Sequence, residues 1–389
     1  MSVRAYDRDV RIGHVVPQAG RLGGYERQAR TLALAQARLA DGVVPVLLTQ
    51  PDEIAAAGWP ASIEACGIAE PSEIAGAIDG MDVLHLHAMD AWSSWFADSA
   101  AQTGTPFVLK VATQGDVVLF SNPDGNNVLS ERVRQWGSAA RHLAAATWGR
   151  YKAETFRIAW ERFRHAGMFI ALNRAIVNEL ESVGIEPQRI MLVPNAVEIP
   201  EAPVRFNIDG ARAVCIARAE PRKRLSDLLG ALPEVQAGVR HATLTVLTQG
   251  AGAETLARAA RGMTGVEILS GGQSAESVLA GADLFLFPSE REGCPNALLE
   301  AAAAGLACVA TAIPGVTDWF RDEREALLYR PGDIPGLVRQ WRRALENSGL
   351  RRQLGQRARG AVAQQAEAGL IARQYRDLYG RLLAWARST

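Results

Sequence analysis

The fold of this chain is decided by the stretch Phe287-Pro-Ser-Glu-Arg-Glu292-Gly-Cys-Pro-Asn-Ala-Leu-Leu-Glu300, which places two carboxylates at E-x7-E spacing. The residues that end at Phe287 form a continuous apolar run, which predicts a buried strand of a parallel sheet, and Pro288 stops that strand. Ligands of such sheets bind just beyond the carboxyl ends of the strands. The stretch therefore predicts an α/β fold with a ligand site around Glu292.

A helix is predicted directly after this turn. Pro295 fits the first turn of a helix, residues 296–304 are mostly Ala, Leu and Glu, and Gly305 is a natural C-terminal stop. The free N–H groups and the positive dipole end of this helix would face whatever binds after Glu292. Such a helix start suits a diphosphate, so the pair of carboxylates suggests a sugar-nucleotide site.

The segment resembles the signature of the retaining glycosyltransferases of family four, which have the GT-B fold. The resemblance implies that Glu292 faces the donor sugar and that Glu300 hydrogen-bonds the ribose hydroxyls of the nucleotide. It also implies that the phosphates meet the backbone of four successive residues, Gly293, Cys294, Pro295 and Asn296. An ordinary strand-turn-helix with two solvated glutamates is the alternative for these residues taken alone.

A second turn after an apolar strand, at 213–217, carries Arg218 and Lys223. Arginine can bind a diphosphate through bidentate hydrogen bonds, and lysine acts as a mobile point charge. The turn resembles the family's "GR…K" motif, which implies that these two cations neutralise the leaving nucleoside diphosphate. A solvated basic turn is the alternative, because Arg222 and Arg224 carry the same charge.

The N-terminal segment predicts a βαβ unit whose first turn contains Gly23 and Gly24. Glycines at a helix start let backbone approach a ligand closely. In the family, an equivalent Gly-Gly loop lines the cleft opposite the donor. A tight turn without a ligand is the alternative.

His85 and His87 end another apolar strand. We expect one of these imidazoles to lie near the ligand site and the other to face the opposite side of the strand. His87 is the catalytic candidate, and a core-packed histidine is the alternative.

After the next strand the family commonly has a histidine, whereas this chain has Gln114, followed by Asp116. An amide can bind a sugar but cannot act as a base, so Asp116, His87 or the departing phosphate must take the acceptor proton.

Length and composition are consistent with two α/β domains, because 389 residues exceed the size at which one core usually keeps growing. Lys+Arg 42 against Asp+Glu 42 gives no net charge, which argues against nucleic acid as a partner. The cysteines lack CxxC spacing, which predicts reduced core thiols of a cytoplasmic protein; they are Cys66, Cys215, Cys294 and Cys308. We expect neither a signal peptide nor a transmembrane helix.

The strand pattern repeats in two halves. The predicted strands lie near 11–16, 43–48, 82–87, 106–112, 168–172 and 190–193, and then near 213–217, 243–248, 266–269, 283–287, 307–310 and 327–329. The resemblance implies two Rossmann-like domains that face across a cleft. We place the acceptor-binding domain at 1–197, a linker at 198–206, the donor-binding domain at 207–365, and a helix at about 366–389 that crosses back to the first domain.

The stretch 131–165 predicts a helical insertion rich in aromatic residues and arginine. Packing against the domain is favoured. Weak peripheral contact with the inner face of the membrane is the alternative.

These patterns predict a metal-independent enzyme that moves a sugar from a nucleoside diphosphate sugar to a nucleophilic acceptor and needs no cofactor. The D-x-D pattern of Asp7 and Asp9 precedes the first strand and is interpreted as a solvated tail, so no metal ligands are assigned. A sugar-nucleotide epimerase of the same architecture and a catalytically silent relative are the alternatives. The base, the sugar, the acceptor and the oligomeric state are not specified by these patterns.

Overall fold

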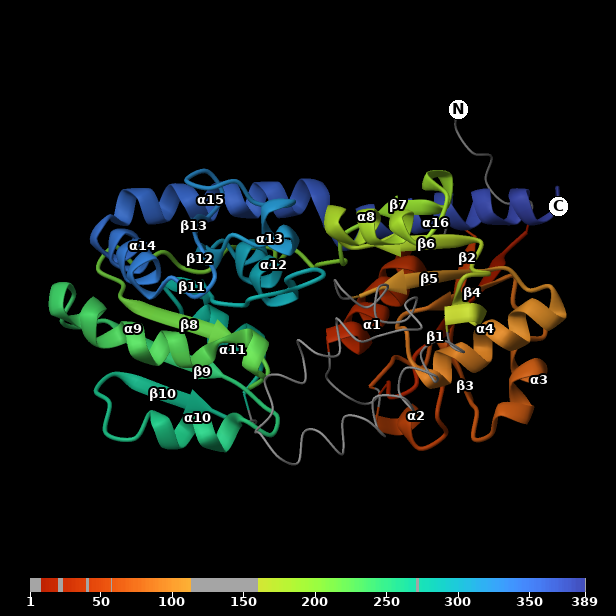
Figure 1. Ribbon diagram of the computed structural model, residues 1–389, viewed down its shortest axis with the longest axis horizontal. Helices are drawn as coiled ribbons and strands as arrows, with labels where there is room; N and C mark the ends of the chain where they lie inside the picture. Colours follow the sequence, from red (N-terminus) through yellow and green to blue (C-terminus); the bar gives the residue numbers. More distant parts are fainter. Residues whose placement is uncertain are drawn as a thin grey trace. The chain divides into compact units, whose positions relative to one another are not determined.

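The computed structural model describes residues 8–19, 24–39, 42–56, 58–112, 160–270 and 273–388. The chain divides into two compact units, Met1–Ala196 with Ala368–Thr389, and Val197–Glu367. Each unit contains one parallel sheet (Figure 1).

The first unit holds a seven-stranded sheet with strand order β3-β2-β1-β4-β5-β6-β7. Its strands are β1 Val10–Val15, β2 Val43–Thr49, β3 Glu64–Gly67, β4 Val83–Leu86, β5 Phe107–Val111, β6 Met168–Ala171 and β7 Ile190–Leu192. Its described helices are α1 Gly24–Leu39, α2 Glu53–Ala56, α3 Ile74–Ile78, α4 Ala91–Thr103, α8 Arg174–Ser182 and α16 Ala368–Ala386, with short 3-10 turns at Pro71–Glu73 and Pro187–Arg189.

The second unit holds a six-stranded sheet with strand order β10-β9-β8-β11-β12-β13. Its strands are β8 Arg212–Ile216, β9 Thr243–Leu247, β10 Val266–Leu269, β11 Leu284–Phe287, β12 Ala307–Thr311 and β13 Leu327–Tyr329. Its described helices are α9 Leu225–Gly238, α10 Ala253–Ala259, α11 Ala275–Ala280, α12 Asn296–Ala303, α13 Pro314–Thr317, α14 Ile334–Glu346 and α15 Ser348–Gln365, with the 3-10 turn η3 at Pro221–Lys223.

Both sheets bury their central strands because those strands are apolar on both faces. All residues of β11 and β12 are buried, as are all residues of β4 and β5. In each sheet the strand order reverses once, between β1 and β4 and between β8 and β11. The carboxyl ends of the strands at such a reversal point form the usual ligand site of an open α/β sheet.

The C-terminal helix α16 packs on the first unit, beside α1 (Figure 1). Tyr375, Leu378 and Tyr379 are buried in the same core cluster as Ile12 of β1. Helix α16 approaches the backbone closely at Gly167, where an added Cβ would meet the end of the Leu382 side chain. The predicted return of this helix to the first domain is confirmed.

Two details differ from the sequence-based expectations. Strand β3 was not predicted, because two of its four residues are exposed, the other two are only half-buried, and none is β-branched. Pro295 precedes α12 as its N-cap and does not occupy the first turn. The segment 198–206 lies within the second unit, where Val204 N–H donates to the carbonyl of Ala304 at 2.7 Å, and its role as a linker stays a prediction.

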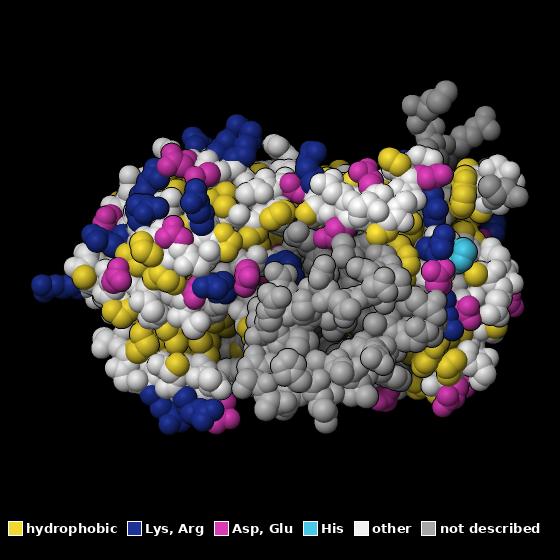
Figure 2. Space-filling view, in the orientation of Figure 1, with side chains coloured by type: hydrophobic (Ala, Val, Ile, Leu, Met, Phe, Trp, Pro, Cys, Tyr) yellow, Lys and Arg dark blue, Asp and Glu magenta, His cyan; other side chains and the backbone are white. Residues whose placement is uncertain are grey.

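On the face drawn in Figure 2, the described Lys and Arg side chains are interspersed with Asp and Glu side chains. None of the described helices is both long enough and apolar enough to span a bilayer. All four cysteines are free thiols, and three of them are buried. Burial raises the pKa of Cys215 to about 12, so this thiol stays protonated at neutral pH.

Candidate active site

The candidate site of the second unit lies beyond the carboxyl ends of β8 and β11, the two neighbouring strands at which the sheet order reverses. β8 ends at Ile216, and Arg218 follows shortly after it. β11 ends at Phe287, and the loop after it carries Glu292. Parallel pairing of the two strands therefore brings two segments together that are about 70 residues apart in sequence.

The first segment is a tight basic turn. Lys223 N–H donates to the carbonyl of Glu220 at 2.9 Å, and Arg224 N–H donates to that of Pro221 at 3.0 Å. Arg224 then adopts the left-handed conformation with φ 50°, and its guanidinium pairs with Asp227 at 2.7 Å. This sharp change of direction starts α9 and lets the preceding side chains reach the loop after β11.

Glu292 is held by two cations. The ammonium of Lys223 pairs with its Oε1, and Nη1 of Arg222 donates to its Oε2 at 3.1 Å. The side chains of Glu292 and Lys223 are only 9% and 14% exposed. A carboxylate this deeply buried requires such compensation to remain charged.

The ion pairs continue to the surface. Nε of Arg222 donates to Glu220 at 3.0 Å, and Glu220 also pairs with Arg218 at 2.8 Å. Three cations thus face two carboxylates, which leaves one excess positive charge for an anionic ligand.

The predicted diphosphate cations are therefore already engaged with protein carboxylates, Lys223 with Glu292 and Arg218 with Glu220. Arg222, for which the sequence had indicated no role, joins these two pairs. Arg222 lies in a run of three basic residues, 222–224, which indicates a basic turn. The run alone does not indicate which of the three side chains contacts Glu292.

Close packing fixes the loop that carries Glu292. A Cβ on Gly315 of α13 would lie 2.6 Å from the carbonyl oxygen of Glu292 and 3.1 Å from that of Gly293. Thr311 Oγ1 donates to the carbonyl of Ser289 at 2.5 Å. The loop is thus held both by β12 and by α13.

Close packing also accounts for Gly252, which follows β9. A Cβ on Gly252 would lie 2.5 Å from the carbonyl oxygen of Ala219. Ala219 N–H in turn donates to the carbonyl of Gln249 at 2.8 Å. Gly252 therefore lies directly against the basic turn that follows Arg218.

The E-x7-E partner Glu300 lies in α12 and is half-buried. Cys294 is buried, and Asn296 begins the helix. The described geometry therefore places the whole predicted nucleotide segment, 292–300, at the carboxyl end of β11 and the start of α12.

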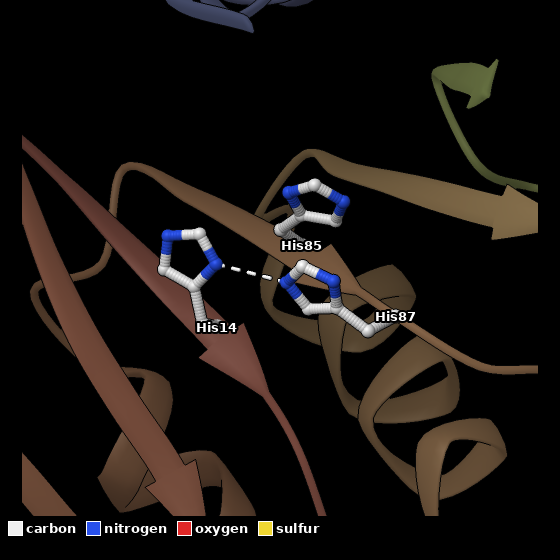
Figure 3. A group of neighbouring side chains, drawn as sticks. All are labelled: His14, His85 and His87. Carbon is white, nitrogen blue, oxygen red and sulfur yellow. Dashed lines mark hydrogen bonds between the residues drawn. The ribbon is translucent and has the colours of Figure 1, made fainter. Parts of the chain in front are cut away.

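In the first unit, His14, His85 and His87 form a buried cluster (Figure 3). His14 Nδ1 lies 2.9 Å from His87 Nε2, and its Nε2 lies 2.8 Å from Gln36 Oε1. His85 Nδ1 lies 2.8 Å from the hydroxyl of Tyr379 in α16. The cluster therefore connects β1, α1, β4 and α16.

The expectation that His85 and His87 face opposite sides of their strand was wrong. Residues i and i+2 of a strand point to the same face. Accordingly, the two rings are stacked with centroids 3.9 Å apart and an interplanar angle of 13°.

One ring nitrogen from each of the three histidines can be chosen so that the three atoms lie within 4.8 Å of one another, which is close enough to consider a metal ion. Imidazole lone pairs lie in the ring plane, so two nearly parallel stacked rings do not aim their lone pairs at one point. Both nitrogens of His14 are already hydrogen-bonded, to Gln36 and His87. The cluster is a hydrogen-bonded core network in this arrangement, and no metal ligands are assigned to it.

The remaining predicted site residues are divided between described and undescribed segments. Gly24 begins α1 in the first unit. Gly23, Gln114 and Asp116 lie outside the described residues, as does most of the predicted insertion at 131–165. Within the described end of that insertion, Trp160 and Phe163 are buried, as expected for packing.

Residues 210–347 match the family described as group 1 glycosyl transferases. N-acetyl-alpha-D-glucosaminyl L-malate synthase of Bacillus anthracis is 34% identical over 102 residues, which cover 26% of this chain and 27% of that protein. 2-Deoxystreptamine N-acetyl-D-glucosaminyltransferase of Niallia circulans is 32% identical over 98 residues, 25% of each chain. The matches thus span about a quarter of the length of these curated relatives.

Solved structures cover nearly the whole chain. HepE of Anabaena, crystallised in complex with UDP, matches with a TM-score of 0.71 at 14% identity over 95% of this chain and 99% of that chain. Sucrose-phosphate synthase from Thermosynechococcus elongatus matches with a TM-score of 0.73 at 17% identity over 97% of this chain and 100% of that chain. The fold is GT-B. The predicted GT-B architecture and the likeness to family-four glycosyltransferases are confirmed.

Proposed function

We propose that this GT-B protein is a retaining glycosyltransferase that moves a sugar from a nucleoside diphosphate to an acceptor hydroxyl. The proposal rests chiefly on one observation: Lys223 and Arg222 converge on Glu292 beyond the carboxyl ends of β8 and β11, directly before α12. The family match over residues 210–347 includes all of these residues.

The proposed reaction breaks the bond between the anomeric carbon and the diphosphate oxygen, and both electrons leave with the diphosphate. The acceptor oxygen bonds to the same face of the anomeric carbon, and its proton passes to the departing phosphate. Lys223 and Arg218 would stabilise the developing negative charge, together with the N–H groups at the start of α12.

Glu292 would act on the sugar side of the broken bond, where positive charge develops at the anomeric carbon. A carboxylate already held by two cations is a weak nucleophile, which favours a role in orienting the sugar and in stabilising positive charge at the anomeric carbon. Glu300 would bind the ribose hydroxyls. The contributions of Gly24 and His87 to acceptor binding stay predictions.

UDP-N-acetylglucosamine is the donor to test first. Both curated relatives are named for an N-acetylglucosaminyl group, and the HepE structures contain UDP or UDP-glucose. A thermal-shift series with UDP, GDP and ADP identifies the base, because a ligand at about a hundred times its Kd stabilises by about 2.7 kcal/mol. Lack of any shift with all three would contradict the proposal.

Lys223→Ala tests the proposed charge stabilisation. We expect kcat to fall about a hundredfold, because a preorganised contact to the leaving group is worth roughly 3 kcal/mol. The fold should persist, since Arg222 still compensates Glu292. Circular dichroism checks the fold, and unchanged turnover in a folded variant would refute the assignment of Lys223.

A further inference from the structure

Arg222 contacts the Glu292 loop in three places. Its backbone carbonyl accepts from Glu290 N–H at 2.8 Å, and its Nη1 donates to the carbonyl of Arg291 at 3.2 Å and to Glu292 Oε2 at 3.1 Å. Its Nε donates to Glu220 at 3.0 Å. The guanidinium is thus fixed at both ends, between its own turn and the loop after β11.

Lys223 differs from Arg222 although both pair with the same carboxylate. Within the part of the chain that the structure describes, its ammonium pairs with a single group, Oε1 of Glu292. A lysine head group is a compact charge on a flexible stem, whereas a guanidinium is a rigid planar fork. An incoming diphosphate can therefore attract the ammonium more easily than it can detach the guanidinium.

We propose that Arg222 is a positioning residue that keeps Glu292 oriented and charge-compensated while Lys223 turns from this carboxylate to the diphosphate of the donor. The inference rests on the proposed function. The exchange needs Arg222, because a carboxylate with 9% exposure that lost both of these cations would be strongly destabilised. Glu292 would then rotate away, and its contact with the sugar would be lost.

The test compares three variants with the wild type. Arg222→Gln removes the positive charge. Arg222→Lys keeps a positive charge but lacks the planar guanidinium that donates to several groups at once. Arg212→Gln is the matched control: Arg212 pairs with Asp283 at 3.1 Å, and the pair joins the amino ends of the same two strands, β8 and β11. Asp283 is as buried as Glu292. The control therefore measures how much stability and activity are lost when any guanidinium is removed from a buried carboxylate.

We expect Arg222→Gln to lower kcat by roughly 10- to 100-fold, the scale of a small misplacement of a reacting group. The Kd for UDP, measured by calorimetry, and the KM for UDP-N-acetylglucosamine should rise, but by less than in Lys223→Ala, because Lys223 can still reach the diphosphate although its release from Glu292 is harder. Arg222→Lys should recover part of kcat. Arg212→Gln should keep the wild-type kcat.

Two results would overturn this inference but not the proposed function. The first is an unchanged kcat in folded Arg222→Gln. The second is a loss of UDP binding as large as that in Lys223→Ala, which would make Arg222 a phosphate ligand. A wild-type protein that neither binds UDP, GDP or ADP nor turns over a donor would overturn the proposed function, and this inference with it. Thermal unfolding of all variants shows whether each one is folded.

Discussion

At Gly315 the absence of one methyl group determines where the Glu292 loop can lie. The atom nearest to a Cβ at this position would be the carbonyl oxygen of Glu292, at 2.6 Å, and the carbonyl oxygen of Gly293 would also be close. Real Cβ atoms essentially never come within 3.0 Å of another heavy atom in this way. A side chain at position 315 would therefore displace the backbone that carries Glu292.

Gly315→Ala should displace the Glu292 loop. We expect a stability loss of about 1–3 kcal/mol from overpacking and a fall of about a hundredfold in kcat from the shift of Glu292. Gly230→Ala in α9 is the control, because its Cβ would meet nothing within 4 Å and alanine favours helix. Thermal unfolding and donor turnover measure both effects, and wild-type turnover in Gly315→Ala would show that the loop tolerates the methyl group.

Glu300→Gln tests the proposed ribose contact. A carboxylate that accepts hydrogen bonds from ribose binds the ground state and the transition state alike, so its loss should raise KM more than it lowers kcat. We expect the Kd for UDP to rise about tenfold, which corresponds to about 1.4 kcal/mol. Glu276→Gln, at an exposed position of α11, is the control. Calorimetry that finds equal UDP affinity in both variants would make Glu300 structural.

At the scale of elements, the histidine cluster attaches the C-terminal helix to the sheet of the first unit. Tyr379 of α16 lies within hydrogen-bond distance of His85 in β4 and of Gln36 in α1. Burial lowers the pKa of His14 to about 4, and the charge of Lys110 acts in the same direction, whereas the hydrogen bond with Gln36 opposes it. Burial also holds the pKa values of His85 and His87 well below 6.5.

These directions predict that the first unit loses stability on acidification. The three imidazoles are neutral in the fold, while the unfolded chain takes up protons near pH 6.5. Their stabilisation is thus complete above pH 6.5 and is lost as the pH falls toward the folded-state values, about 4 for His14. Each histidine should contribute about 1 kcal/mol per pH unit in this window.

Calorimetric unfolding at pH 7.5 and pH 5.5 measures this loss. His14→Gln should reduce the difference between the two pH values, whatever its effect at pH 7.5. His165→Gln, at an exposed position, should leave the difference unchanged. Equal pH dependence in all three proteins would show that the cluster does not control acid stability.

At the scale of the whole molecule, charge is balanced overall and concentrated locally. The sequence has no net charge, yet the turn after β8 directs Lys223 and Arg222 to one carboxylate and leaves one excess cation in the pair network. If these side chains and the start of α12 meet the diphosphate as proposed, no bridging divalent ion is expected.

We therefore expect donor turnover to persist in excess EDTA. The assay is transfer or hydrolysis of UDP-N-acetylglucosamine with EDTA, and then with added magnesium or manganese as the control. Complete loss of activity in EDTA that either metal restores would show that protein cations do not suffice at this site.

The sequence by itself determined the order of the central strands and the position of the predicted nucleotide segment. Continuous apolar runs predicted the central strands, such as β11, because burial on both faces leaves a strong signal in composition. Strand β3, whose residues are exposed or only partly buried, left no such signal. E-x7-E spacing located Glu292 and Glu300, since both follow one strand within a single local unit.

Only the tertiary structure decided which charges meet. Arg222 and Glu292 are 70 positions apart, and their pairing depends on the adjacency of β8 and β11 and on the left-handed turn at Arg224. The network of His14, His85 and Tyr379 likewise depends on α16 returning to the first sheet. Local patterns encode local geometry, whereas the partner of a buried charge is fixed by strand order and packing, which no short stretch of sequence contains.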